Sequence, residues 1–386
     1  MLKTIRNTFF ILVIIGFIIL FGFVPTSMDK SMNKVTTTYT GTPRNDYQSL
    51  PFIADLHCDM LLWDRNFLKD HDYGHVDLPR MQKANMAFQI FTIVSKTPRG
   101  INIEQNSDET DQIALLSFAQ LRPPSNWFSI KARALNQCQE LYEAAEDSDG
   151  AFRVVSTQKD LRQFVNDRTN DHTLTAGMLG LEGAHCLEGD INNLKTFYDA
   201  GVRYIGLAHF FDNEWAGSAH GMKKEGLTDI GKQLVTKMGE MNMIIDLAHS
   251  SSKTIDDVFT LTDRPVIISH TGVKGMCNNQ RNLSDKHLIE IGKRNGLVGI
   301  GLWSTAVCGN DAEATVKSIR YVADMIGVNK VTLGSDFDGA LTTHFDVTGL
   351  PLIMEALKKD NFTNKEIELI MGGNVRDFLL RNLPAN

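Results

Sequence analysis

The chain has 386 residues, of which 42% are hydrophobic and 22% are charged, as in an ordinary globular protein. Its net charge is -7 at pH 7, and the sequence contains no cluster of Lys and Arg residues that would follow a phosphate backbone. The composition therefore argues against nucleic acid as a partner.

The N-terminus has the pattern of a targeting segment. Lys3 and Arg6 precede an apolar run over residues 9–24, which Pro25 ends. That order is typical of a secretory signal or a signal anchor. At about 1.5 Å per residue the run spans roughly 24 Å, short of the roughly 30 Å hydrocarbon core, and no clear cleavage site follows it. Residues 1–26 are therefore expected to be a signal peptide or an anchor, and the rest of the protein is expected to be periplasmic, at the cell surface or attached to the membrane.

Two later segments are expected to lie outside the regular fold. Residues 27–50 are polar and show no apolar period, so we expect a flexible linker there. Folded sequence is expected over residues 51–386. Within it, residues 95–150 begin with a mostly polar, proline-containing stretch and end in a helical pattern, and we interpret them as an insertion.

Eight short apolar runs predict buried β-strands. They lie at residues 54–59, 86–94, 174–181, 204–208, 243–246, 265–269, 297–301 and 330–334. From about residue 174 these runs alternate with amphipathic helical patterns, one of which should end at Gly327. Eight such units predict a closed parallel (β/α)₈ barrel of the TIM type. The alternative, an open doubly wound sheet, normally has a glycine-rich phosphate loop after its first strand, and none occurs there.

Side chains that can bind metals recur where the predicted strands end. They are His57, Asp59, Glu182, His209, His249, His270 and Asp336. The carboxyl ends of barrel strands meet at one rim, so we expect these residues to lie close together. Two further histidines, His185 and His220, lie just downstream of such motifs and are intermediate cases. The remaining histidines are expected at the surface, namely His71, His75, His172, His287 and His344.

This set of ligands favours zinc or a similar divalent ion, because it has imidazoles and carboxylates but no thiolate. One catalytic zinc usually has three protein ligands, so two metals account better for the number of ligands. We expect Glu182 to bridge the ions, with His57 and Asp59 completing one site and His249 and His270 the other. Such a pair can hold a bridging hydroxide at neutral pH, and no serine or cysteine nucleophile is then required.

Each of these residues also has a simpler interpretation. A single histidine at a strand end is more often a hydrogen-bonded core residue than a ligand. Asp336 could be a helix N-cap, Arg281 a solvated charge, and His209 a residue packed against neighbouring aromatic rings. Burying all of the predicted ligands at one rim without a cation would be costly, and this favours the metal interpretation for the set as a whole.

Several ordered motifs resemble the membrane (renal) dipeptidase family. They are Asp55-x-His57-x-Asp59, Gly180-Leu181-Glu182-Gly183-x-His185, Asn213-x-Trp215-Ala216, Asp246-Leu247-Ala248-His249, Ser269-His270 through Arg281-Asn282, and Asp336-Phe337-Asp338-Gly339. The resemblance covers nearly everything from Asp55 to the C-terminus. It implies an amidohydrolase-type barrel with two zinc ions per chain, a homodimer, and removal of the C-terminal residue from dipeptides. Family members often accept a D-residue there, and some hydrolyse β-lactams.

The resemblance also implies roles for three residues. His209 would polarise the scissile carbonyl, Arg281 would bind the free carboxylate of the substrate, and Asp336 would carry a proton to the leaving amine. Cys277 and Cys308 stand where relatives form a disulfide. The chain departs from the family after the seventh strand, where residues 301–306 lack a tyrosine that binds substrate in some relatives.

Three functional hypotheses follow. The first is an exported zinc dipeptidase. The second is another binuclear metal amidohydrolase, acting on a lactone, a cyclic amide or a phosphoester. The third, from a different class, is a non-catalytic binding protein at the cell surface that has kept the barrel. Arg281 favours the first over the second, because a substrate without a carboxylate does not need it.

Overall fold

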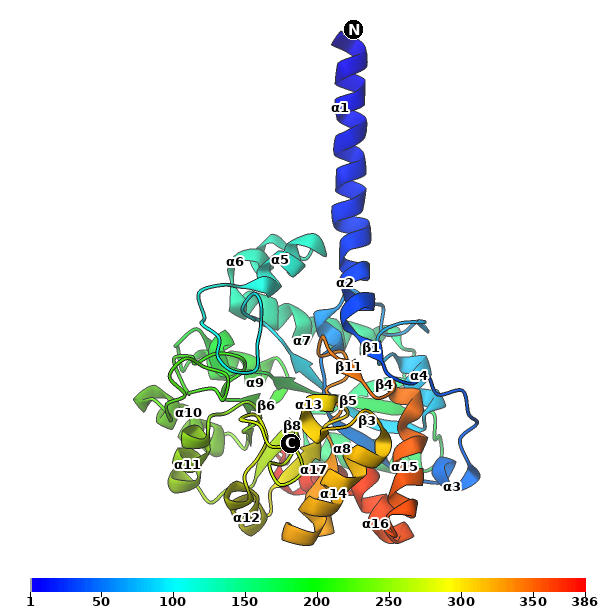
Figure 1. The fold of residues 1–386 in the computed structure, drawn as a ribbon, viewed down its shortest axis with the longest axis vertical. Helices are drawn as coiled ribbons and strands as arrows, with labels where there is room; N and C mark the ends of the chain where they lie inside the picture. The colour runs from blue at the N-terminus through cyan, green and yellow to red at the C-terminus, as the bar shows by residue number, and fades with distance from the viewer. Residues whose placement is uncertain (1) are drawn as a thin grey trace.

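A computed structural model describes the backbone of residues 2–386, and all of their side chains except those of residues 2, 3, 13, 14 and 18 (Figure 1). Its central element is a ring of eight parallel strands. These are β2 (Ile53–Cys58), β3 (Met86–Ile93), β5 (Thr175–Leu181), β6 (Val202–Gly206), β7 (Ile244–Asp246), β8 (Val266–Thr271), β9 (Leu297–Ile300) and β10 (Val331–Leu333). They pair in the order β3-β2-β10-β9-β8-β7-β6-β5, and pairing between β3 and β5 closes the ring. The expected TIM-type barrel is confirmed.

Helices surround the ring. They are α3 (Asn45–Gln48), α4 (Leu78–Lys83), α7 (Ile130–Asp147), α8 (Gln158–Arg168), α9 (Asn193–Asp199), α10 (Asp229–Glu240), α11 (Ser252–Leu261), α12 (Asp285–Lys293), α13 (Ser304–Val307), α14 (Ala312–Ile326), α15 (Leu350–Lys359), α16 (Asn364–Glu368) and α17 (Asn374–Asn382). Helix α14 begins at Asp311, whose carboxylate accepts the backbone N–H of Ala314, and it ends at Gly327, whose φ of 101° suits glycine. Both ends therefore follow from local sequence.

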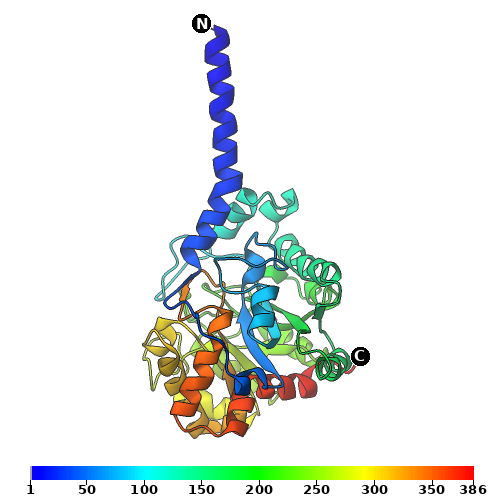
Figure 2. The same cartoon turned by 90° about the vertical axis from the view of Figure 1, so that its right-hand side faces the viewer.

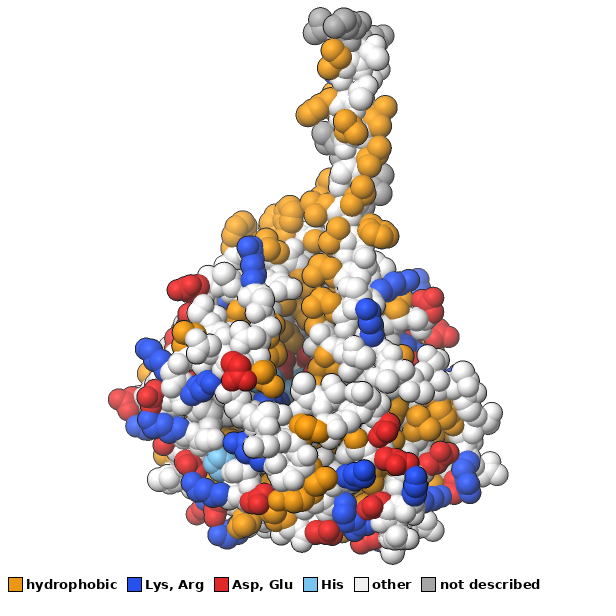
Figure 3. Space-filling view, in the orientation of Figure 1, with side chains coloured by type: hydrophobic (Ala, Val, Ile, Leu, Met, Phe, Trp, Pro, Cys, Tyr) orange, Lys and Arg blue, Asp and Glu red, His pale blue; other side chains and the backbone are white. Residues whose placement is uncertain are grey.

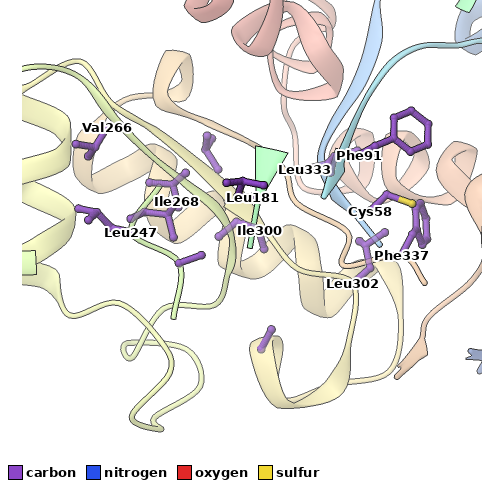
Figure 4. Close-up of a cluster of buried hydrophobic side chains, with 14 of the residues drawn as sticks. Cys58, Phe91, Leu181, Leu247, Val266, Ile268, Ile300, Leu302, Leu333 and Phe337 are labelled. Carbon is purple, nitrogen blue, oxygen red and sulfur yellow. The ribbon is translucent and has the colours of Figure 1, made fainter. Parts of the chain in front are cut away.

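The barrel strands are buried on both faces, because helices cover the outside and side chains fill the inside. Figure 4 shows part of this packing, in which Cys58 lies beside Phe337, and Ile268 beside Leu247. Continuous apolar strands of this kind are the pattern that the sequence showed. The interior is therefore a packed core.

Three short strands were not expected. Strand β4 (Phe152–Val154) extends the sheet by pairing with β5, and β1 (Lys34–Val35) pairs with β11 (Thr342–Thr343) outside the barrel. Segments of two or three residues carry no measurable alternation of apolar and polar side chains. Their conformation is set by the neighbouring segment on which they lie.

The N-terminal helix extends away from the barrel (Figures 1 and 2). It consists of α1 (Leu2–Phe17), a π-helical stretch (Ile18–Phe23) and α2 (Val24–Met32). The helix does not end where the apolar run ends, since it continues past Pro25 to Met32.

The segment expected to be a flexible linker contacts the barrel at several points. Asp29 is buried, residues 34–35 pair with β11, and the hydroxyl of buried Tyr47 donates to the carbonyl of Ala84 at 2.7 Å. A few buried side chains hold this segment although its composition is polar. The domain boundaries at residues 26 and 50 stay predictions.

The insertion also contains helices that the sequence did not predict. Helices α5 (Gln112–Ala119) and α6 (Pro124–Phe128) lie beside the base of the N-terminal helix (Figure 1). The following α7 buries Ala134, Cys138 and Leu141 on one face. A disulfide joins Cys277 to Cys308 and so connects the segments that follow β8 and β9, as the family resemblance implied.

Candidate functional site

The carboxylate of Glu182, directly after β5, is the centre of the rim at which the strands end. Its Oε1 lies 3.3 Å from Nε2 of His57, 3.2 Å from Nε2 of His249 and 3.5 Å from Nε2 of His270. Its Oε2 lies 3.3 Å from Nε2 of His209. Four imidazoles, carried by or following four different strands, therefore meet at one carboxylate.

Two further carboxylates lie on the His57 side of this cluster. The Nε2 atom of His57 is 3.4 Å from Oδ1 of Asp59 and 3.8 Å from Oδ1 of Asp336. The hydroxyl of Thr92, on β3, donates to Asp59 and holds that carboxylate in place. Asp336 follows β10, so the first and last strands of the ring both supply acids to the same place.

On the other side, the Nε2 atoms of His249 and His270 lie 2.9 Å apart. His249 has a φ of 59° and Asp336 a φ of 61°, a left-handed conformation that non-glycine residues rarely adopt. Such conformations persist only where the surrounding structure enforces them, and they occur often at functional sites. Here they turn both side chains toward Glu182 and His57.

A layer of hydrogen bonds behind the imidazoles sets their orientation. The hydroxyl of Ser269 lies 3.2 Å from Nδ1 of His57 and 2.9 Å from Nδ1 of His270, and it donates to the carboxylate of Asp246 at 2.6 Å. Buried Asp55 in turn accepts the backbone N–H of Ser335 at 2.6 Å. Outer partners of this kind orient histidine ligands at metal sites.

These outer residues were not among the predicted site residues. A signal for them existed, because Asp55, Asp246 and Ser269 each stand one to three residues from a predicted ligand in the same motif. Their role depends on contacts across the barrel, so proximity along the chain alone would not have shown it.

Burial and charge set the protonation of the cluster. Burial lowers the pKa of His209, His249 and His270 well below its usual value, which keeps their rings neutral. Burial acts the same way on His57, but the nearby Glu182 and Asp59 carboxylates outweigh it and raise its pKa. Burial, followed by repulsion from Asp59, raises the pKa of Glu182 to about 7. Neutral imidazoles are the form that binds metals.

The residues present fit divalent metal ions. Nε2 of His57 and Oε2 of Glu182 are buried and have no hydrogen-bond partner among the described residues. Such atoms are costly to bury unless something satisfies them. Ligand atoms lie within 4.8 Å of one another in three sets, namely His57, Glu182 and His270; Glu182, His209 and His249; and His57, Asp59 and Asp336. All three sets have nitrogen and oxygen donors only, as zinc and similar ions accept.

These sets overlap the expected ligand pairs and differ from them in one way. His209 and Asp336, expected to act on the substrate, also lie within ligand distance. Glu182 belongs to two of the three sets, as a bridging ligand should. The assignment of particular residues to two separate ions stays a prediction.

A cavity of about 580 Å³ opens over the cluster. Its floor includes Asp59, Glu182, His209, His249 and Asp336. Arg281 also lines it, and its guanidinium is held by a hydrogen bond of 2.8 Å from Nη2 to the carbonyl of His270. The cavity therefore combines metal-binding side chains with one fixed cation, which suits a small substrate that has a carboxylate.

The structure places the other histidines differently from expectation. His220 lines the cavity, and its Nδ1 lies 2.8 Å from the carbonyl oxygen of Ile103. His185 is buried, with Nε2 3.0 Å from the hydroxyl of Ser95. The expectation that His75, His287 and His344 lie at the surface was wrong, since all three are buried. The sequence around these histidines is polar and suggested exposure, but segments distant along the chain bury them.

Comparison with known proteins identifies relatives over most of the chain. The profile of the family described as Membrane dipeptidase (Peptidase family M19) matches residues 47–379. Dipeptidase aclJ of Aspergillus oryzae is 29% identical over 84% of this chain and 76% of its own length. Dipeptidase tcpJ of Claviceps purpurea is 27% identical over 90% of this chain and 79% of its own length.

Two solved structures share the fold. The dipeptidase AC, a metallopeptidase of family M19, has a TM-score of 0.70 and 24% identity, covering 87% of this chain and 99% of its own. A metallopeptidase from Rhodobacter sphaeroides, solved with a phosphinate mimic of the dipeptide L-Ala-D-Ala, has a TM-score of 0.69 and 25% identity, covering 86% and 99%.

Proposed function

The chain belongs to the membrane dipeptidase family and is a metallo-dipeptidase of that type. From this premise we propose that it is an exported enzyme that binds two zinc ions and hydrolyses dipeptides. The observation that carries the proposal is the arrangement at Glu182, whose carboxylate lies 3.2–3.5 Å from four imidazole nitrogens. The N-terminal helix would direct export and anchor the chain.

We assign His57, Asp59 and Glu182 to one zinc ion, and Glu182, His249 and His270 to the other. When bound, the two ions supply Lewis-acid chemistry, which activates water and polarises the carbonyl of the substrate. Ser269 and Asp246 keep the ligand rings in position, as outer partners do at such sites.

Three residues act on the substrate in this proposal. His209, neutral because it is buried, donates a hydrogen bond from Nε2 to the carbonyl oxygen as negative charge develops there. Asp336 takes a proton from the attacking water on a carboxylate oxygen and delivers it to the nitrogen of the leaving amine. Arg281 binds the free carboxylate of the substrate through its paired N–H groups.

The proposed substrates include dipeptides with a C-terminal D-residue, since the Rhodobacter sphaeroides relative was solved with a mimic of L-Ala-D-Ala. They also include β-lactams, which present an amide and a carboxylate close together. On the resemblance alone we propose a homodimer. The hypothesis of a cell-surface protein without catalysis predicts a decayed site, whereas every predicted ligand is present in the cluster.

A metal-exchange experiment tests the proposal. The purified chain should contain about two zinc ions by mass spectrometry. A chelator should lower the hydrolysis of L-L and L-D dipeptides at least about 100-fold, because the cluster then has no Lewis acid, and added zinc should restore it. Activity that survives complete removal of the metal would contradict the proposal.

A substitution at Arg281 distinguishes the dipeptidase from the second hypothesis, an amidohydrolase for substrates without a carboxylate. Arg281→Met should lower kcat/KM for a dipeptide by about 30- to 100-fold, equivalent to the roughly 2–3 kcal/mol of a hydrogen-bonded charge pair. The same dipeptide with a C-terminal amide should lose little, because it has no carboxylate to bind.

The control is Arg162→Met, an exposed arginine on α8, which should leave both substrates unchanged. An equal loss for the acid and the amide would mean that Arg281 supports the structure and does not bind the carboxylate. A wild-type enzyme that prefers lactones or phosphoesters to both dipeptide forms would favour the second hypothesis.

A further inference from the structure

The N-terminal helix is long enough to cross a bilayer and is almost entirely uncovered. The membrane-length helix extends from Thr4 to Met32. At about 1.5 Å per residue, the apolar run over residues 9–24 rises roughly 24 Å, and the preceding turn of the helix, residues 4–8, brings the total to the roughly 30 Å of the hydrocarbon core. Arg6 lies near the far end, where its long side chain can reach the headgroups. The membrane boundary on the barrel side therefore falls close to Phe21 and Val24.

At this level, aromatic side chains of the helix and of the insertion form a continuous chain. The ring of Phe21 lies 5.3 Å from that of Phe118 on α5, and the ring of Phe118 lies 4.9 Å from that of Trp127 on α6. Trp127 in turn lies 6.3 Å from Phe128. Tryptophan and other aromatic side chains are enriched at membrane interfaces.

The surface next to this chain is apolar and exposed. Leu115, Leu121 and Phe128 are 51%, 56% and 87% exposed, and Figure 3 shows such side chains continuing from the helix onto the shoulder formed by α5 and α6. Residues 112–130 contain a single charged residue, Arg122, and its guanidinium pairs with Glu140. An exposed apolar surface of this kind marks an interaction site.

The mouth of the catalytic cavity is built from the same two elements. Met28 and Met32 of α2 and Ile113 and Leu116 of α5 all line it. Met32 is eight residues beyond Val24, so Met28 and Met32 lie within roughly 12 Å of the membrane boundary along the helix. The cavity therefore opens beside the apolar shoulder, on the side from which the helix leaves.

We propose that α5 and α6 form a lipid-docking surface that, together with the N-terminal helix, holds the mouth of the catalytic cavity at the surface of the bilayer. The proposal rests on the membrane anchoring proposed above. The occupant is lipid because the shoulder is continuous with the membrane-length helix, lies at the level where that helix leaves the hydrocarbon core, and carries no unpaired charge among the described residues.

A depth measurement on the full chain in phosphatidylcholine and phosphatidylglycerol vesicles tests the proposal. Phe128→Cys would carry a nitroxide label, and the native cysteines are either buried or joined in the disulfide. A nitroxide in lipid collides with dissolved oxygen more often, and with a water-soluble nickel chelate less often, than a nitroxide in water. We expect the residue 128 label to be at least about 5-fold better protected from the chelate than a control label. A Leu121→Cys label should behave in the same way.

The matched control is Ile289→Cys, on α12 at the end of the barrel farthest from the N-terminal helix (Figure 1). Ile289 is itself an exposed apolar residue, so its label should be fully open to the chelate. Equal access at residues 128 and 289 in vesicles that float with the protein would overturn the docking surface alone. Failure of the protein to float would overturn the anchoring and this proposal together.

A second copy of the chain is the other occupant that would protect residue 128. Nanodiscs that hold one copy each separate the two cases. Protection that persists in them supports lipid contact, and protection that disappears on dilution to one copy overturns it.

Discussion

Glu182→Gln is expected to lower kcat/KM for a dipeptide at least about 10³-fold. This exceeds the 10- to 100-fold loss typical of a missing outer partner at a metal site, because Glu182 is itself at the centre. The replacement removes the negative charge and turns one oxygen into an N–H₂ group that faces imidazole nitrogens 3.2–3.5 Å away. An amide at this position cannot bridge two cations.

Steady-state kinetics and zinc content measured on the same preparation check this prediction. The zinc content should fall together with the activity. Glu225→Gln is the control, because that carboxylate is exposed and pairs with exposed Lys253, and both readouts should stay within about 2-fold of wild type. Full activity in Glu182→Gln would show that the cluster is not the catalytic centre.

Arg65→Met is expected to destabilise the folded protein by about 3–5 kcal/mol, the typical effect of breaking a buried ion pair. Arg65 is buried, with Nε 2.7 Å from Oδ2 of Asp29 and Nη2 2.5 Å from Oδ1 of Asp338. Its loss leaves two buried carboxylates without a cation. Burial raises the pKa of Asp338, but the Arg65 guanidinium outweighs it and the pKa lies below its usual value.

Thermal unfolding in detergent measures this effect. Arg44→Met is the control, because Arg44 is exposed and its 3.5 Å contact with Asp46 is open to solvent, so a change within about 0.5 kcal/mol is expected. Adding Asp29→Asn to Arg65→Met removes one unpaired charge and should recover part of the loss. Equal unfolding temperatures for the Arg65 and Arg44 variants would contradict the prediction.

The Arg65 cluster also has a structural consequence. It connects the base of the N-terminal helix to the loop that carries Asp336, which is two residues from Asp338. Arg65→Met is therefore expected to loosen the mouth of the cavity as well as the fold. The segment between the apolar helix and the barrel therefore helps to hold the loop that carries Asp336.

Local sequence was sufficient to predict the barrel fold and the types of residue at its rim. Burial on both faces requires continuous apolar strands, and the runs around residues 86–94 and 174–181 showed them directly. His57, Glu182 and His249 were identifiable because strand ends meet at one rim of any parallel barrel. These features depend on neighbours along the chain, so the pattern alone carries them.

The tertiary structure alone decided which distant residues meet. The Asp29–Arg65–Asp338 cluster joins three segments, and Ser269 connects the rings of His57 and His270 to Asp246. The chain of rings from Phe21 through Phe118 to Trp127 is a third case. A polar or aromatic residue looks the same in sequence whether its partner is water or a side chain that closure of the barrel brings against it. Only the folded chain distinguishes the two, because the free energy of burying such a group depends on the partner it finds.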